Sequence, residues 1–155
     1  MATNSISGAR SADLDKSRTP AQWYCLLVGL VLLAAGALGF LVNSSFGEAA
    51  LGLDLNDGEL INGDLFLGLE VNGWHNIVHL ASGLVLLLAA ASRALAKIVA
   101  LTFALVYVGV TVIGFLDGND VLGIIPVNTA DNLLHAAIAA VGLLAALISP
   151  AGNRP

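Results

Sequence analysis

The sequence predicts an all-α membrane protein, a four-transmembrane-helix bundle built from two tandem helical hairpins in an N-in/C-in orientation. Hydrophobic residues make up 57% of the 155 residues and charged residues only 11%, with a mean hydropathy of +0.88, which does not suit a soluble globule of this length. Four segments approach the roughly 20 apolar residues that a helix needs to cross a bilayer. The basic residues also fall where four spans would place them on one side.

The predicted helices follow the four apolar segments. Leu, Ala, Val and Gly dominate these segments without a period-2 alternation, which favours helices over the strands of a barrel. The helices are expected at about residues 22–42, 73–92, 97–116 and 129–149, with an extracytoplasmic loop at 43–72, a disordered cytoplasmic tail at 1–21 and a short cytoplasmic tail at 150–155. A short basic loop with Arg93 and Lys97 joins the second helix to the third.

The charges predict the orientation. The basic side chains are Arg10, Lys16, Arg18, Arg93, Lys97 and Arg154. With four spans they share one side, which the positive-inside rule assigns to the cytoplasm of a bacterial plasma membrane. Most of the acids, and with them the net charge of -5, belong to the opposite face. An acidic outer face gives no support to nucleic-acid binding.

The first outer loop is the longest segment between the predicted helices. It alternates apolar and polar residues at 51–55 and again at 65–71, with the turn signal Asn56-Asp57-Gly58 between them. We therefore expect a short hairpin over the mouth of the bundle, with an interfacial helix as the alternative. The acids beside this turn do not match the spacing of a calcium loop and are expected to be solvated.

One eight-residue phrase occurs twice and holds all three histidines, as Asn72-Gly73-Trp74-His75-Asn76-Ile77-Val78-His79 and Asn128-Thr129-Ala130-Asp131-Asn132-Leu133-Leu134-His135. Each phrase lies where an acidic loop enters an apolar segment, so Asn72 and Asn128 are expected to cap the helices that follow. Asp131 suits the positive end of a helix, and its counterpart in the first phrase is His75.

A second motif also repeats, because Gly39-Phe40-Leu41 ends the first predicted helix and Gly114-Phe115-Leu116 ends the third. Together the two motifs indicate an internal repeat of two helical hairpins. Units with an even number of spans insert the same way up, related by an approximate two-fold axis along the membrane normal. The second and fourth helices should therefore meet at the outer mouth with their polar phrases facing each other.

The polar residues of the phrases are expected to form one cluster of Asn72, His75, Asn76, His79, Asn128, Asp131, Asn132 and His135. At the depth of His79 and His135 a polar group should face protein or water. We expect hydrogen bonds from Asn76 to His135 and from Asn132 to His79, and a pairing of Asp131 with His75. This interpretation assigns no catalytic residue, metal or cofactor.

Two other interpretations of the same residues stay open. Facing imidazoles can ligate a haem iron from two sides or share a transition-metal ion, with His79, His135, His75 and Asp131 as the candidate ligands. No CxxCH or HExxH motif accompanies them. The second alternative is a path for protons or a small solute, although no charged residue within the spans continues it toward the cytoplasm.

In these residues the chain resembles a family of small four-helix bacterial integral membrane proteins that is described only as a domain of unknown function. The likeness is carried by NGWHNIVHLASGL at 72–84, by the aromatic-containing third helix and by PVNTADNLLHAAIAAVGL at 126–143, and it covers roughly residues 20–148. The resemblance implies a multi-pass membrane protein with paired Asn and His motifs, and it implies no activity.

The sequence leaves little room for catalysis. Its cytoplasmic segments are too short for a soluble catalytic domain, and Cys25, the single cysteine, lies inside the first apolar segment. We therefore expect a non-enzymatic membrane protein with the lipid bilayer as its partner. It is expected to serve as a structural or accessory subunit of a larger membrane complex or as a homo-oligomer.

Overall fold

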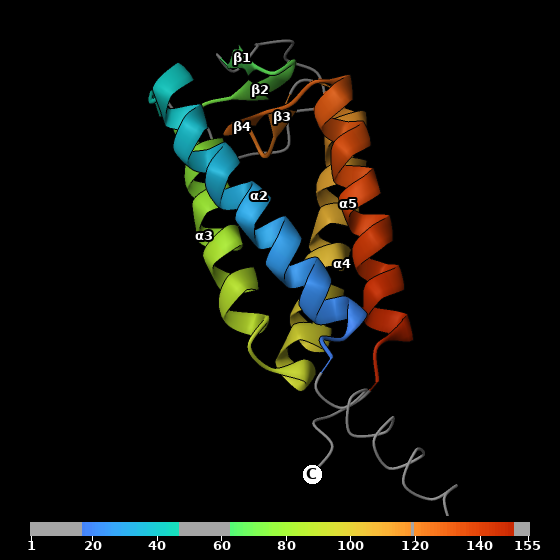
Figure 1. Ribbon diagram of the computed structural model, residues 1–155. Coiled ribbons are helices and arrows are strands. Elements are labelled where there is room, and N and C mark those ends of the chain that lie inside the picture. Colours follow the sequence, from blue (N-terminus) through green and yellow to red (C-terminus); the bar gives the residue numbers. More distant parts are fainter. Residues whose placement is uncertain (1–16, 47–62, 119, 151–155) are drawn as a thin grey trace, which may run out of the picture.

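The computed structural model describes residues 17–46, 63–118 and 120–150. This part of the chain is all-α apart from two short β-hairpins, and its four helices run alongside one another with the strands gathered at one end (Figure 1). In chain order the elements are α2 (Pro20–Val42), β1 (Asp64–Phe66), β2 (Leu69–Val71), α3 (Gly73–Ala89), α4 (Arg93–Asp117), β3 (Asp120–Val121), β4 (Ile125–Pro126) and α5 (Thr129–Ile148).

The helices pack mainly as two pairs, α2 with α3 and α4 with α5, whereas α3 and α4 contact each other little. Small residues permit close approach in the first pair, since a Cβ added to Gly83 would lie 2.8 Å from the carbonyl oxygen of Gly29. Fully buried alanines, Ala96, Ala100 and Ala104, form the inward face of α4. A seam between α3 and α4 is left more open than the other contacts.

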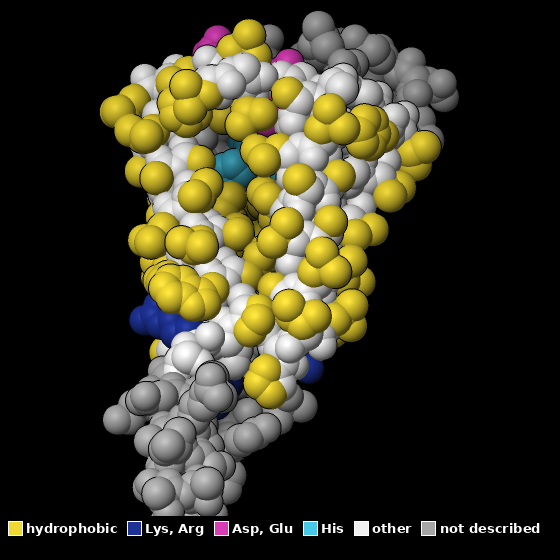
Figure 2. Space-filling view, turned by 45° about the vertical axis from the view of Figure 1, so that its right-hand side comes forward, with side chains coloured by type: hydrophobic (Ala, Val, Ile, Leu, Met, Phe, Trp, Pro, Cys, Tyr) yellow, Lys and Arg dark blue, Asp and Glu magenta, His cyan; other side chains and the backbone are white. Residues whose placement is uncertain are grey.

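Three helices, α2, α4 and α5, are long and apolar enough to cross a membrane by length and composition, and α3 is apolar but has only 17 residues. Many Leu, Val and Ile side chains on their outward faces are exposed. Figure 2 shows these apolar side chains covering the helices, with Lys and Arg near the end opposite the strands and Asp and Glu near the strand end. Such a surface indicates a membrane protein.

The end opposite the strands is tied together by hydrogen bonds. The capping box at the start of α2 includes Gln22, whose side chain also donates to the carbonyl of Ala90 at 3.0 Å. The backbone N–H of Ala21 donates to the Ser149 hydroxyl at 2.8 Å, and Lys97 donates to the Ser149 carbonyl at 2.6 Å. These bonds join the ends of all four helices.

The helix boundaries differ from the predicted ones mainly between α3 and α4. α3 ends at Ala89 rather than at residue 92, and α4 begins at Arg93 rather than at residue 97. The prediction of a basic loop was wrong, because Arg93 and Lys97 both lie in the first turns of α4. The Ser92 side chain accepts a hydrogen bond from the N–H of Leu95 and starts the helix before its apolar segment begins.

Each pair of strands is an antiparallel hairpin directly before a helix, β1 with β2 before α3 and β3 with β4 before α5. Both turns contain a Leu-Gly pair with positive φ. Leu67 and Gly68, at φ 55° and 86°, form the whole two-residue turn of the first hairpin, whereas Leu122 and Gly123, at φ 60° and 68°, are followed by Ile124 in the three-residue turn of the second. The first hairpin differs from the expected one, because residues 65–71, predicted as one strand, turn back on themselves at Leu67 and Gly68. The predicted turn at 56–58 and the predicted tails at 1–16 and 151–155 lie outside the described residues.

Candidate metal centre

Two asparagines cap the helices at the strand end, as expected. The side-chain oxygen of Asn72 accepts a hydrogen bond from the backbone N–H of His75 at 2.9 Å. The side-chain oxygen of Asn128 accepts one from Ala130 at 2.8 Å and one from Asp131 at 3.1 Å. Both caps satisfy N–H groups that have no partner within the helix.

The amide nitrogens of the same two side chains join the two halves of the structure. Asn72 Nδ2 donates to the carbonyl of Ile124 at 2.9 Å, in the β3–β4 hairpin. Asn128 Nδ2 donates to the carbonyl of Gly68 at 3.0 Å, in the turn between β1 and β2. Each cap therefore binds the hairpin that precedes the other helix, which holds the first turns of α3 and α5 close together.

Asp131 anchors this junction from the first turn of α5. It is 2% exposed, and its Oδ2 atom accepts hydrogen bonds from the backbone N–H groups of Glu70 at 2.9 Å and Asn128 at 3.0 Å. No hydrogen bond or ion pair joins Asp131 to His75 in the described part of the chain, so their expected pairing is not seen. The carboxylate is held by backbone N–H groups, which form strong hydrogen bonds to a charged acceptor.

Glu70 should make the stability of the protein depend on pH. Burial, and after it the charge of Asp131, raises the pKa of the Glu70 carboxyl above its ordinary value. The folded protein therefore binds this proton more tightly than the unfolded chain does. This contribution to the free energy of unfolding is fully present below the ordinary pKa and is lost as the pH rises through the raised pKa.

Glu70→Gln removes this loss, so the variant should gain melting temperature over the native protein as the pH rises through that window and should match it at more acidic pH. Thermal unfolding in detergent across the acidic range measures the difference. A Glu70→Gln effect that stays constant across the range would contradict the expected titration.

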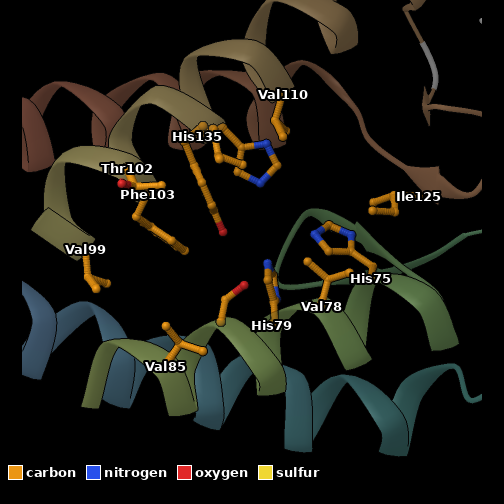
Figure 3. A pocket seen from close by; sticks show the side chains of 13 residues that line it. His75, Val78, His79, Val85, Val99, Thr102, Phe103, Val110, Ile125 and His135 are labelled. Atoms are coloured by element: carbon orange, nitrogen blue, oxygen red, sulfur yellow. The ribbon is translucent and has the colours of Figure 1, made fainter. Parts of the chain in front are cut away.

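The three histidines converge at the strand end. His75 and His79 lie one turn apart on α3 and His135 reaches them from α5, so that one nitrogen of each ring lies within 4.8 Å of the others. The ring centroids of His75 and His79 are 4.4 Å apart, and those of His75 and His135 are 6.1 Å apart. Figure 3 shows the three rings at one end of a pocket. In the described part of the chain, the buried Nδ1 atom of each ring has no hydrogen-bond partner.

Asn76 and Asn132 face away from the histidines. The Asn76 side chain lies against Gly39 of α2 and donates to the carbonyl of Asn43 at 2.8 Å. The Asn132 side chain lies in the same way against Gly114 of α4. Each asparagine is therefore packed within its own helix pair.

The expected hydrogen bonds from Asn76 to His135 and from Asn132 to His79 are consequently wrong. Residues three apart on a helix point about 60° apart around its axis, which is enough to separate their surroundings. The asparagines face the preceding helix of their own pair, whereas the histidines face the junction between the two pairs. The polar phrases thus contribute two different structures, a pair of Asn–Gly contacts and one group of histidines.

A cavity of about 360 Å³ adjoins the histidines and continues along the seam between α3 and α4. Five valines and Phe103 are among its lining residues, and Tyr107 of α4 lies edge-on to His135 with ring centroids 5.1 Å apart. Figure 2 shows a histidine at the bottom of a hollow between the helices, near the strand end. The histidine group is therefore open toward the side of the bundle.

The donor set suits a transition-metal ion. Neutral imidazoles are common ligands of Zn²⁺, Cu²⁺, Ni²⁺ and iron, and three of them leave a coordination position free. A buried polar atom without a partner needs an explanation, and a bound ion is one. Asp131, which was also a candidate ligand, is not among the convergent groups, because its Oδ2 atom is bonded by two backbone N–H groups.

Three residues of this region were not recognised as site residues in the sequence. The repeated Gly-Phe-Leu motif was the available signal for Gly39 and Gly114, and it was interpreted only as a trace of duplication. Tyr107 lies among apolar residues of α4 without any motif around it. Its place beside His135 depends on how α4 packs on α5 and could not be inferred from spacing alone.

A comparison with known families matches residues 22–148 to the model described as Domain of unknown function (DUF4383). No curated protein and no solved structure matches the chain. The matched residues include nearly all of α2, both hairpins, the remaining helices and the histidine group. The chain therefore belongs to the DUF4383 family, a domain of unknown function.

Proposed function

We propose that the protein is a multi-pass membrane protein that binds one transition-metal ion through His75, His79 and His135. The observation that carries the proposal is the convergence of three imidazole nitrogens from two helices to within 4.8 Å. Tetrahedral zinc–nitrogen bonds of about 2.0–2.1 Å require only small side-chain rotations from this arrangement. Three convergent rings favour a single ion over haem, because a porphyrin ring must lie between two imidazoles.

The ion would join the two halves of the protein. Two of its ligands come from α3 and the third from α5, two helices that face each other beside the loosely packed seam between α3 and α4, whereas α2 packs on both α4 and α5. Binding energy at such a site adds directly to the stability of the folded state. We therefore infer a non-enzymatic, structural or accessory role, with the metal holding the bundle in the form that a larger membrane complex or a second copy of the chain recognises.

We also propose four spans in two tandem hairpins, with both termini in the cytoplasm of a bacterial plasma membrane. The close packing of α2 with α3 and of α4 with α5 supports the hairpins. The repeated Leu-Gly turns, Asn caps and Asn–Gly contacts support an internal duplication. Arg93 and Lys97 lie at the end opposite the acids, which supports the orientation under the positive-inside rule.

The metal proposal predicts uptake of about one Zn²⁺ or Co²⁺ per chain after removal of metal with a chelator. The protein should be purified without a polyhistidine tag, because its own three histidines are then the only ones present. Zinc at about 100 times its Kd should raise the free energy of unfolding by about 2.7 kcal/mol. Co²⁺ should give the visible absorption of a tetrahedral site.

His79→Ala and His135→Ala should each abolish this uptake, and Asp64→Ala, an exposed acid away from the histidines, should leave it unchanged. Circular dichroism checks that each variant remains helical. Stoichiometric zinc in both histidine variants would exclude these ligands. A Soret band that disappears with either substitution would replace the single ion by haem.

The orientation is tested by labelling introduced cysteines in a Cys25→Ala background. A membrane-impermeant maleimide added to intact cells should react with Asp64→Cys, which lies at the strand end. It should reach Arg93→Cys, at the opposite end, only after the membrane is made permeable. Labelling of Arg93→Cys from outside in intact cells would reverse the proposed orientation.

A further inference from the structure

The cavity beside the histidines extends well beyond them. Its lining on α4 runs from Val99 to Val110, a length of roughly 16 Å at 1.5 Å per residue. Its volume of about 360 Å³ lies at the lower end of the range of roughly 300–1,000 Å³ for small-molecule sites. A metal ion at the histidines would leave most of this space free.

Besides the histidines, a tyrosine hydroxyl in this cavity has no hydrogen-bond partner in the described part of the chain. Tyr107 is 5% exposed and lines the cavity, yet its hydroxyl makes no hydrogen bond within the described part of the chain. The other tyrosine, Tyr24, is similarly buried, but its hydroxyl donates to the carbonyl of Ile138 at 3.2 Å. A hydroxyl on a residue that lines a cavity and makes no hydrogen bond within the protein can bond a ligand oxygen there.

Aromatic rings surround the same end of the cavity. Phe103 lies beside Tyr107 with ring centroids 4.4 Å apart and ring planes inclined by 32°, and Tyr107 meets His135 at 89°. With His75 and His79 they form a group of five rings. Flat aromatic molecules pack well against such faces and edges. The rest of the lining is mainly valine, with Ser82 and Thr102 as further side chains that carry a hydroxyl.

The cavity opens toward the side of the bundle rather than toward its polar end. Val78, Val85 and Val106 line it and are 39%, 52% and 55% exposed, on helix faces that are otherwise apolar. In a membrane these faces lie against lipid. A ligand would therefore enter from the bilayer and would have to be soluble in it.

We propose that this cavity binds a lipid-soluble aromatic molecule with a ring hydroxyl or carbonyl oxygen, of the phenol, quinol or quinone class. Its ring lies between Phe103 and the valines of α3, and its oxygen hydrogen-bonds the Tyr107 hydroxyl at the histidine end. The site goes beyond the metal centre, and it does not require an ion to be bound. A whole phospholipid exceeds the volume, and a saturated chain would make no use of the rings.

The test uses 2-naphthol and the full-length protein in phosphatidylcholine nanodiscs, with binding measured by equilibrium dialysis against empty nanodiscs. Saturable binding of about one molecule per chain is expected. Val106→Trp should weaken it by about tenfold or more, because the indole fills the cavity. Val112→Trp is the matched control, since Val112 is 51% exposed on the same helix and does not line the cavity.

The polar contact is tested separately. Tyr107→Phe should weaken 2-naphthol binding by roughly three- to tenfold, the effect of one hydrogen bond, whereas Tyr24→Phe should not change it. Naphthalene, which lacks the hydroxyl, should bind more weakly than 2-naphthol and should not respond to Tyr107→Phe.

The outcomes separate this site from the metal centre. Absence of saturable 2-naphthol binding, equal effects of Val106→Trp and Val112→Trp, or no effect of Tyr107→Phe would overturn the inference. Tighter binding of decanoic acid than of 2-naphthol would also overturn it, in favour of a site for acyl chains. Zinc uptake without 2-naphthol binding would leave the metal centre standing alone, and 2-naphthol binding without zinc uptake would reject the metal centre and keep the cavity site.

Discussion

Gly114→Ala and Gly39→Ala are each expected to lower the free energy of unfolding by roughly 2–4 kcal/mol, a large effect for the addition of one methyl group. A Cβ at Gly114 would overlap the side-chain oxygen of Asn132, and a Cβ at Gly39 would overlap that of Asn76. Both asparagines are at most 2% exposed, so neither amide can move aside into solvent. The helices would have to separate, or the amide would have to break out of its packing.

The same geometry explains how two buried amide oxygens are accommodated. In the described part of the chain, Asn76 Oδ1 and Asn132 Oδ1 have no conventional hydrogen-bond partner. Each lies where a Cβ of the facing glycine would be, which is the direction of one glycine Cα–H bond. A weak Cα–H···O contact is available only to a glycine in this position. The glycine therefore leaves room for the amide oxygen and also donates the weak Cα–H contact to it.

Unfolding titrations with SDS in mixed micelles provide the measurement. Gly109→Ala is the matched control, because Gly109 lies on α4 like Gly114 and a Cβ there would have no heavy atom within 4 Å. It should be neutral or slightly stabilising, since alanine favours helix.

A double-mutant cycle then tests the cause. In an Asn132→Ala background the added methyl group no longer meets the amide, so Gly114→Ala should cost much less than it does in the native protein. Additive losses in this cycle would mean that Gly114 and Asn132 do not interact, and the explanation by overlap would have to be given up.

The helices and their caps follow from sequence patterns, whereas side-chain directions within the polar phrases do not. The lengths of the apolar segments locate all four helices to within a few residues, because a helix that crosses a membrane needs a continuous apolar segment. Asn72 and Asn128 were predictable as caps because an asparagine before an apolar segment has one favourable role. The start of α4 was misplaced because Ser92 caps it with a hydrogen bond that hydropathy does not register.

The pairing of asparagines with histidines failed for a geometric reason. An expected two-fold arrangement places both phrases at one end of the bundle, and His75, His79 and His135 do meet there. Which neighbour each side chain faces depends on how its helix is rotated about its own axis. That rotation depends in turn on where glycines allow neighbouring helices to approach each other closely. The contact of Asn76 with Gly39 required linking the Gly-Phe-Leu motif to the polar phrase, and spacing within either motif alone holds no such information.

The sequence also could not predict that each Asn cap binds the hairpin that precedes the other helix. The nine residues 64–72 and the nine residues 120–128 both begin with Asp and end with Val-Asn, with a Leu-Gly turn between. This similarity marks equivalent segments. It does not reveal that Asn72 binds the hairpin of the second segment and Asn128 that of the first. The same sequence pattern would be expected if each asparagine bound the hairpin of its own segment.

Asp131→Ala is expected to lower the free energy of unfolding by roughly 3–5 kcal/mol, because it removes a buried carboxylate that accepts hydrogen bonds from two part-buried backbone N–H groups. These belong to Glu70 and Asn128, one in each half of the protein, at a residue that is 2% exposed. Loss of a carboxylate from the first turn of α5 adds a helix-dipole cost of about 0.3–1 kcal/mol.

Asp131→Asn keeps an acceptor oxygen at the same place and should lose only about 1–2 kcal/mol, which separates the hydrogen bonds from the charge. Asp64→Ala, at an exposed acid on β1, is the control and should lie within about 0.5 kcal/mol of the native protein. Because the charge of Asp131 helps to raise the pKa of Glu70, both Asp131 variants should also reduce the pH-dependent stabilisation by Glu70→Gln. If Asp131→Ala proves as mild as Asp64→Ala, the junction between the two hairpins is held by Asn72 and Asn128 alone.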